Sequence, residues 1–191
     1  MVGTGSPRRA CQIRALRRDL TIRDLRGNVD TRLAKLRRGD YDAVVLALSG
    51  VRRLGAQVEG SVLDFDQMIP AVGQGALAIE ARSGDAGVAS VLRPLHHAGT
   101  AAAVAAERAF LRGLGGGCQA PIAAVAEIDG ARMLLRGLVG DVEGRRVLRA
   151  RTEGDAAEPE ALGRGLAERL LAQGAGEMLR AAPPALPPEG P

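Results

Sequence analysis

Residues 41–48 read Tyr-Asp-Ala-Val-Val-Leu-Ala-Leu and decide the fold class. The run has the length of a strand, and after Asp42 it is apolar without interruption. An uninterrupted apolar run is typical of a strand buried on both faces of a parallel sheet, whereas a half-exposed strand alternates apolar and polar residues. We therefore expect a parallel sheet around this strand.

Helix and strand signals alternate along the chain before this run. Ser6 is a good N-cap for a first helix, and residues 21–25 predict a short strand. A second helix should follow, capped by Asn28 or Asp30 and ended by Gly39. Another short helix is expected just after the apolar run. This alternation indicates an α/β fold.

The second half of the chain has a different pattern. Residues 72–80 resemble a loop that enters a strand, and Thr100 should cap a longer helix. Turn signals such as Asp129-Gly130 predict three antiparallel strands between residues 121 and 152. Apolar residues at helical spacing follow over residues 158–181. The second half is therefore predicted to be a small α+β domain with a three-stranded antiparallel sheet.

The charge balance points to an anionic partner. The chain has 26 basic residues, almost all of them arginine, and a net charge of +4. Arginine binds carboxylates and phosphates through two parallel hydrogen bonds. Aromatic residues make up only 2% of the chain and tryptophan is absent, so a platform that stacks nucleic-acid bases is not expected. The arginine content also has a simpler interpretation as compositional bias.

Other site classes have little support in the sequence. Cys11 and Cys118 lie far apart and form no metal-binding pattern with His96-His97, so we expect neither a disulfide nor a metal site. We interpret Cys11 as a packed core residue and both histidines as structural. No apolar run is long enough to span a membrane, and the first residues show no apolar signal segment, so a cytoplasmic location is expected.

Residues 3–9, Gly-Thr-Gly-Ser-Pro-Arg-Arg, are a candidate anion site. A glycine-containing loop that enters a capped helix presents free backbone N–H groups at the positive end of the helix dipole. Arg8 and Arg9 add two cations in the first helical turn, where positive charge is unfavourable for the dipole. Binding of an anion would compensate for that placement. The alternative is a solvated basic helix start.

Three further arginines follow the predicted strands. Arg26 comes at the end of the first predicted strand segment, Arg32 in the first turn of the next helix, and Arg53 shortly after the apolar run. Ligands of α/β sheets bind outside the carboxyl ends of the strands, where these residues are expected to lie. The alternative interpretation of each of them alone is a surface arginine.

Cys118 follows the glycines 115–117. These glycines give the backbone the freedom to leave a helix and carry a thiol into a neighbouring cleft. A free cysteine is otherwise most often buried, so the alternative is a packed thiol.

At these residues the chain resembles the porphobilinogen deaminase (hydroxymethylbilane synthase) family. Seven blocks occur in order: Gly-Thr-x-Ser-x-Arg-Arg at 3–9, Leu-Arg-Gly-Asn-Val-x-Thr-Arg-Leu at 25–33, Tyr-Asp-Ala-x-x-Leu-Ala at 41–47, Arg-Leu-Gly at 53–55, Pro-Ala-Val-Gly-Gln-Gly-Ala at 70–76, Ala-Glu-Arg-Ala at 106–109 and Gly-Gly-Cys-Gln at 116–119. Ordered blocks over most of the chain are more specific than any single motif.

The resemblance implies a transferase of tetrapyrrole (haem) biosynthesis. Such an enzyme condenses four porphobilinogen units into hydroxymethylbilane with loss of ammonia, on a dipyrromethane cofactor bound through a thioether, here to Cys118. It also implies that the cofactor is bound by Cys118, Thr4, Ser6, Arg8, Arg9, Arg32 and Gly75, and the substrate and growing polypyrrole by Arg26, Arg32, Arg53 and Gln74. No metal is expected.

The resemblance also implies a division of the chain. Residues 1–70 would be an α/β domain like half of a type II periplasmic binding protein, and residues 71–95 would return to a first domain that is largely absent. Residues 96–182 would be the α+β domain that bears the cysteine, and the proline-rich residues 183–191 a disordered tail. The family's acid/base aspartate belongs to the absent part, so no catalytic residue is assigned.

The chain alone is therefore expected to be an inactive monomer. It would be a truncated reading frame, a fragment or half of a split enzyme whose first domain binds in trans. A different class of function stays open, namely a non-catalytic α/β module that binds small anions. A basic protein that associates with nucleic acid is the third and least favoured hypothesis.

Overall fold

The computed structural model describes residues 1–115 and 120–181. The first unit is a three-stranded parallel sheet with the strand order β2-β1-β3. Its strands are β1 (Val2–Gly3), β2 (Ile22–Arg23) and β3 (Ala43–Val44), and its helices are α1 (Pro7–Leu16), α2 (Val29–Arg37) and α3 (Leu48–Arg53). The α/β prediction for this part of the chain is confirmed.

The predicted helix caps are found in the structure. The Ser6 side chain accepts a hydrogen bond from the first turn of α1, and Asn28 rather than Asp30 caps α2. The Asn28 Oδ1 atom accepts from the Thr31 N–H at 2.9 Å. Gly39 follows α2 with a φ of 81°, the left-handed conformation in which glycine ends helices.

The prediction of a long strand at residues 41–48 is wrong. Only Ala43 and Val44 pair as a strand, and residues 44–47 are half-buried in the described chain. The central strand β1 ends at Gly3, where the chain turns into the loop before α1. A hydrogen-bonded ladder cannot extend beyond its central strand, so β3 is limited to the same length.

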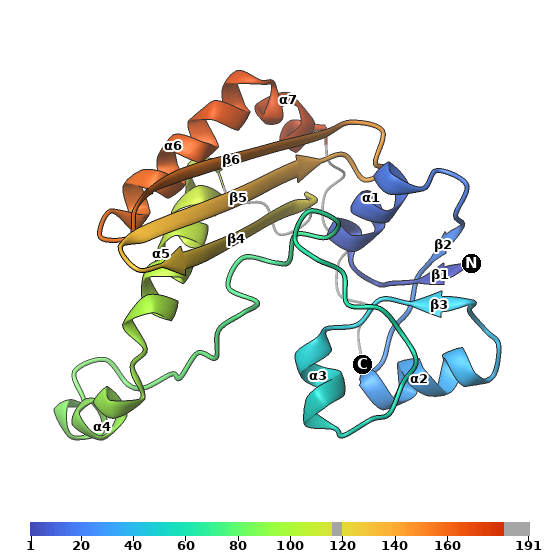
Figure 1. Cartoon of the computed structure of the whole chain (residues 1–191), viewed down its shortest axis with the longest axis horizontal. Coiled ribbons are helices and arrows are strands. Elements are labelled where there is room, and N and C mark those ends of the chain that lie inside the picture. Colours follow the sequence, from blue (N-terminus) through green and yellow to red (C-terminus); the bar gives the residue numbers. More distant parts are fainter. Residues whose placement is uncertain (116–119, 182–191) are drawn as a thin grey trace.

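The second unit is an antiparallel sheet with helices on one face (Figure 1). The strands β4 (Ile122–Asp129), β5 (Arg132–Gly140) and β6 (Val147–Asp155) follow in order, which confirms the three predicted strands. The helices α5 (Ala98–Gly113), α6 (Pro159–Ala172) and α7 (Ala175–Arg180) cover the face whose core contains Phe110, Leu135 and Leu166. The α+β prediction is confirmed.

Three details of this half were predicted incorrectly. Residues 72–80 form turns and irregular chain and no strand. The cap of α5 is His97, whose Nδ1 accepts from the Thr100 N–H at 3.1 Å, so the helix begins before Thr100. The helical pattern over residues 158–181 is two helices, because Gly174 has a φ of 96° and interrupts it.

A long connection joins the two units and carries the short helix α4 (Ala86–Leu92) and the 3₁₀ turn η1 (Arg93–Leu95). In Figure 1 this helix lies apart from both sheets. Large apolar side chains along this connection are exposed: Leu77, Ile79, Val91 and Leu95. Among the described residues, no helix is long and apolar enough to cross a membrane.

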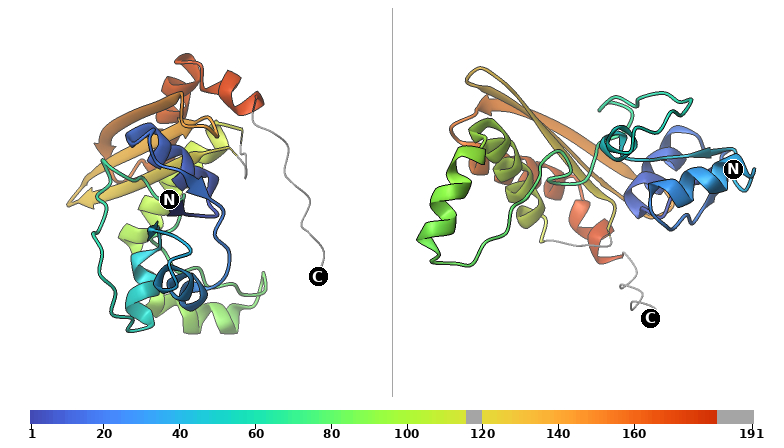
Figure 2. Two further views of the ribbon diagram at one scale, coloured as in Figure 1. Left: turned by 90° about the vertical axis from the view of Figure 1, so that its right-hand side faces the viewer. Right: turned by 90° about the horizontal axis from the view of Figure 1, so that it is seen from below.

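Helix α1 packs against the end of the antiparallel sheet and so joins the units, which lie end to end in the right-hand view of Figure 2. The Cys11 thiol lies against Gly140 of β5, at a point where any side chain on residue 140 would overlap the sulfur. One residue further, the Gln12 side chain is fully buried. Its Nε2 donates to the Ile69 carbonyl at 2.9 Å and its Oε1 accepts from the Ile69 N–H at 2.8 Å.

The contact between α5 and α6 allows a test of the fold. A Cβ atom at Gly163 would lie 2.7 Å from the Ala109 Cβ and 2.8 Å from the Phe110 nitrogen, whereas Gly165 on the same helix has nothing within 4 Å. We expect Gly163→Ala to lower the free energy of unfolding by about 1–3 kcal/mol through overpacking. Gly165→Ala should raise it by up to about 1 kcal/mol through helix propensity.

Urea denaturation of both variants measures these changes. Effects of the same sign in the two variants would contradict the close packing of α5 on α6.

Candidate functional site

The loop between β1 and α1 is held by its own hydroxyl groups. The Thr4 N–H donates to the Arg23 carbonyl at 3.1 Å, and the buried Thr4 Oγ1 accepts from the Ser6 N–H at 3.2 Å. The Ser6 Oγ accepts from the Arg9 N–H at 3.4 Å. Since each hydroxyl accepts a backbone N–H here, each keeps its own hydrogen to donate to an anion.

Glycine at position 5 has a steric cause. A Cβ atom there would lie 2.9 Å from the Leu25 carbonyl oxygen and 3.0 Å from an oxygen of the Asp24 carboxylate. The loop after β1 therefore runs directly against the chain that leaves β2. Both segments lie at the carboxyl edge of the parallel sheet, where sequence analysis placed the site.

Arg8, Arg9 and Arg32 form a cluster of like charges at this edge. Burial lowers the pKa of Arg8, and the positive charge of Arg9 lowers it further. Burial likewise lowers the pKa of Arg9, with an additional effect of Arg32. The cluster is thus less favourable for charged guanidinium groups than water is, and a bound anion would offset that cost.

The hydrogen bonds of this cluster are incomplete. The Arg9 Nη1 donates to the Val45 carbonyl at 3.0 Å, and the Arg32 Nε donates to the Gly27 carbonyl at 2.7 Å. The Arg8 Nε is buried and has no hydrogen-bond partner within the described residues. A buried donor without a partner costs free energy, so an acceptor from a ligand would be stabilising.

Arg26 and Arg53 differ from the other three. The Arg26 Nε forms an ion pair with the Asp24 carboxylate at 2.9 Å, and both side chains are largely exposed. Arg53 is the exposed last residue of α3. No hydrogen bond or ion pair within residues 1–115 and 120–181 joins either of them to the cluster, so their role in binding substrate stays a prediction.

The predicted residues Gln74 and Gly75 lie on an exposed loop. The Gln74 Oε1 accepts from the Ala71 N–H at 3.4 Å, and Gly73 has a φ of 72°. The Gly73 N–H donates to the Glu107 carboxylate at 2.6 Å, which ties this loop to α5.

Glu107 is a buried carboxylate that sequence analysis did not single out. Its second oxygen accepts from the Ala126 N–H of β4 at 3.0 Å, so the side chain bridges the loop, α5 and the sheet. Burial raises its pKa, although the two backbone N–H groups oppose that shift. A signal was present in the sequence, because residue 107 falls three residues after Val104 and four before Leu111 on an otherwise apolar helix face.

Of the two cysteines, the structure describes only Cys11. Cys118, the predicted attachment point, lies outside the described residues, as do residues 183–191. Cys11 is fully buried, and burial raises the pKa of its thiol to about 11. Its prediction as a packed core residue is confirmed. Within the described ranges, no group of three or more His, Cys, Asp or Glu side chains could hold a metal ion.

Two family models match the chain. The model described as "Porphobilinogen deaminase, dipyromethane cofactor binding domain" matches residues 1–90. The model described as "Porphobilinogen deaminase, C-terminal domain" matches residues 101–172. The first match ends within α4 and the second begins in the first turn of α5.

Several curated relatives named porphobilinogen deaminase are similar to the chain. The relative from Roseiflexus castenholzii is 53% identical over 179 residues, which cover 93% of this chain and 59% of the relative. The one from Moorella thermoacetica is 50% identical over 180 residues, 94% of this chain and 58% of the relative. The one from Thiobacillus denitrificans is 51% identical over 185 residues, 96% of this chain and 60% of the relative. The chain thus spans about three fifths of the length of these relatives.

The raised pKa of Glu107 predicts a pH-dependent stability. Glu107→Gln should lower the free energy of unfolding by about 1–3 kcal/mol, because both oxygens of a carboxyl can accept the N–H groups of Gly73 and Ala126, whereas an amide has one acceptor and its NH₂ group opposes the second N–H. A carboxyl whose folded pKa is raised contributes stability that is complete below its unfolded pKa and is lost as the pH rises through the folded value. The difference between the native chain and the variant should therefore narrow as the pH rises.

Urea unfolding between about pH 4 and 7, across the usual glutamate pKa, measures this difference. Glu168→Gln, the same substitution at an exposed position of α6, is the matched control and should change stability by less than about 0.5 kcal/mol. If the difference in free energy of unfolding between the native chain and Glu107→Gln widens as the pH rises, the raised pKa of Glu107 is contradicted.

The arginine cluster predicts binding of polycarboxylates. Citrate should bind the native chain, and Arg9→Met should weaken that binding about tenfold or more, because a charge-assisted hydrogen bond contributes roughly 1.5–3 kcal/mol. Calorimetric titration measures the affinity. Arg38→Met removes the same charge from a surface pair with Asp40 and should leave it unchanged. Equal losses in both variants would indicate general charge attraction instead of a site.

Proposed function

Because this chain belongs to the porphobilinogen deaminase family, we propose that it is the cofactor-bearing part of a hydroxymethylbilane synthase. This transferase joins four porphobilinogen units, each with loss of ammonia, and releases the linear tetrapyrrole with water. The observation that carries the proposal is the cluster of Arg8, Arg9 and Arg32 at the carboxyl edge of a sheet that matches a cofactor-binding domain model.

The charge of the cluster suits the proposed ligand. Each pyrrole of the growing chain carries an acetate and a propionate, so the polypyrrole is a polyanion. Burial and a neighbouring positive charge lower the pKa of Arg8 and of Arg9, and several bound carboxylates would stabilise the charged form of these guanidinium groups. The buried Arg8 Nε atom and the hydroxyl hydrogens of Thr4 and Ser6 are the donors that such a ligand would use.

The proposed roles of individual residues follow from this arrangement. Cys118 would hold the dipyrromethane through a thioether, and this group supplies the end to which new units are added. The carboxylates of the cofactor would be bound by Thr4, Ser6, Arg8, Arg9, Arg32 and the loop at Gly75. Incoming units would be bound by Arg26, Arg32, Arg53 and Gln74. The fixed position of the loop at residues 70–76 would come from the Glu107 hydrogen bond to Gly73.

We further propose that residues 71–95 complete a first domain. Residues 1–70 would then be the second α/β domain, of the type II periplasmic-binding-protein kind, and residues 96–182 the third. The support is the exposure of large apolar side chains on this segment, since Leu77 is 85% exposed and Val91 74%. Soluble proteins seldom expose a run of such residues without a partner surface.

The partner surface would belong to the two fifths of the relatives' length that this chain does not span. It would be covalently continuous with this chain or would bind it in trans, and without it the chain should not turn over porphobilinogen. A cytoplasmic location and a monomeric state stay predictions.

The test is the intact mass of the protein joined to the remaining two fifths of a relative and expressed in cells that make porphobilinogen. We expect a mass increase equal to one dipyrromethane, retained in Cys11→Ser and absent in Cys118→Ser. Cys11 is the matched control because it is buried with a pKa of about 11 and is therefore poorly nucleophilic at neutral pH.

An adduct that survives Cys118→Ser would overturn the proposed attachment. If the protein binds citrate through Arg9 but acquires no pyrrole in any version, the alternative function as a small-anion-binding module is favoured.

A further inference from the structure

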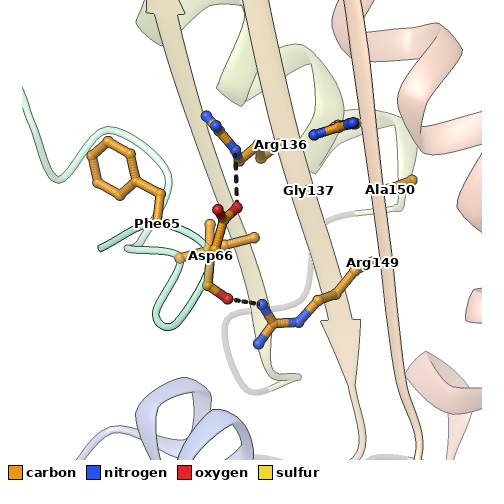
Figure 3. A pocket seen from close by; sticks show the side chains of 8 residues that line it. Phe65, Asp66, Arg136, Gly137, Arg149 and Ala150 are labelled. Carbon is orange, nitrogen blue, oxygen red and sulfur yellow. Dashed lines mark hydrogen bonds and ion pairs between the residues drawn. The ribbon is translucent and has the colours of Figure 1, made fainter. Parts of the chain in front are cut away.

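The antiparallel sheet has a second face, opposite α5 and α6, that the proposed function does not use. Residues 64–69 of the connection cross this face and enclose with it a cavity of about 310 Å³ (Figure 3). The cavity is lined by Phe65, Asp66 and Ile69 from the connection and by residues 136, 137 and 149–151 of β5 and β6. Its volume is at the lower end of the range for small-ligand sites in proteins.

The strand register places two like charges directly opposite each other in this cavity. Arg136 of β5 pairs with Arg151 of β6, and Leu138 pairs with Arg149. Side chains two residues apart on a strand share a face, so all three arginines lie on the same side of the sheet. Directly opposed like charges destabilise a strand pair, and here Glu127 and Asp66 offset the charge of Arg136 but not that of Arg151.

The carboxylates near the cavity neutralise only one of the three guanidinium groups. Arg136 forms ion pairs with Glu127 and, at 3.7 Å, with Asp66, yet its Nε is buried without a hydrogen bond. Figure 3 shows the Asp66 carboxylate directed at Arg136 and the Asp66 carbonyl directed at Arg149. That carbonyl, 2.6 Å from the Arg149 Nη1, is uncharged.

Arg149 and Arg151 form no ion pair with any residue of ranges 1–115 and 120–181. The carboxylate of Glu153, which shares the face, is already paired with Arg132 at 3.2 Å. Arg149 and Arg151 thus border one cavity without an ion-pair partner among the described residues, while the carboxylates of Glu127 and Asp66 both lie at Arg136. A ligand with two negative groups would match them.

The rest of the lining is apolar. The Ile69 side chain is 3% exposed and packs with Leu138 and Val125 in a small core beneath the connection, and Phe65 adds an aromatic ring at the rim. Gly137 and Ala150 face the helices on the other side of the sheet, so they contribute only backbone to the cavity. This combination suits a planar apolar body that carries anionic groups.

The enclosing segment is held in place before any ligand binds. Its end is fixed by the two hydrogen bonds between Gln12 and the Ile69 backbone. Within it, the Asp64 N–H donates to the Gln67 Oε1 and the Gln67 N–H donates to the Asp64 Oδ1, at 3.2 and 2.8 Å. A site that is already ordered loses less conformational entropy on binding.

From these observations we propose that the cavity between residues 64–69 and strands β5 and β6 binds a small aromatic or heteroaromatic dicarboxylate. Arg149 and Arg151 bind its two carboxylates, and Phe65 and Ile69 contact its ring. Porphobilinogen belongs to this chemical class, but the site is separate from the cluster at Arg9 and does not depend on the proposed function.

The experiment is a calorimetric titration of the chain with benzene-1,2-dicarboxylate, together with thermal unfolding. Arg151→Met should weaken binding about tenfold or more through loss of a charge-assisted contact. In the same variant, the dicarboxylate should no longer cause most of its rise in melting temperature, because a ligand stabilises the chain only in proportion to its affinity. Phe65→Ala should weaken binding of the dicarboxylate but not of sulfate.

Two controls separate this site from other effects. Arg164→Met removes one charge from an exposed position of α6, on the helical side of the sheet, and should leave the affinity unchanged. Arg9→Met removes a charge from the other basic cluster and should leave the Arg151-dependent binding intact. The proposal is overturned if Arg164→Met weakens binding as much as Arg151→Met, if the Arg151-dependent binding is lost in Arg9→Met, or if no saturable binding occurs.

Discussion

The packing of α1 against the end of the antiparallel sheet is the contact on which the rest of the arrangement depends. The same helix begins at the anion loop and, one turn later, packs Cys11 against Gly140 and joins Gln12 to the backbone of Ile69. A buried amide with both its donor and its acceptor satisfied tolerates little displacement, because either partner left unpaired would cost free energy. The position of the arginine cluster relative to the α+β unit, and the path of residues 64–69 over the sheet, both follow from this one helix.

A second feature of the molecule is that arginine side chains lie close together in two places. At the carboxyl edge of the parallel sheet, burial lowers the pKa values of Arg8 and Arg9, and the neighbouring charges of Arg9 and Arg32, respectively, lower them further. On the antiparallel sheet, the strand register opposes Arg136 and Arg151. Charges held close together in the absence of anions reduce stability, and a chain that keeps such groups gains affinity for anions in return. The net charge of the chain does not reveal these clusters, because a cluster depends on which arginines share a surface.

Motif reasoning located some parts of the site and missed others, for identifiable reasons. Thr4, Ser6, Arg8 and Arg9 are adjacent in sequence, so a loop and helix motif was enough to group them, and Arg32 joined them because parallel strands end at one edge. Sequence analysis missed Glu107 and Gln12 because each is a single polar residue on an ordinary helix. Each is important because its side chain forms hydrogen bonds with backbone groups that lie far away in the sequence. The strand at residues 41–48 was overestimated because apolar content indicates burial but not the length of the neighbouring strand.

The sequence by itself determined the local structure and the family. Capping residues, turn glycines and apolar spacing are local signals, and they are sufficient for the α/β and α+β units, the antiparallel strands and the ordered motif blocks. Only the tertiary structure decided which charges meet. The opposition of Arg136 and Arg151 and the closure of residues 64–69 over them depend on strand register and on the α1 contact. The position of residues 64–69 over the sheet is a long-range property, because it joins segments far apart in the sequence through the packing of α1 and of the Gln12 side chain.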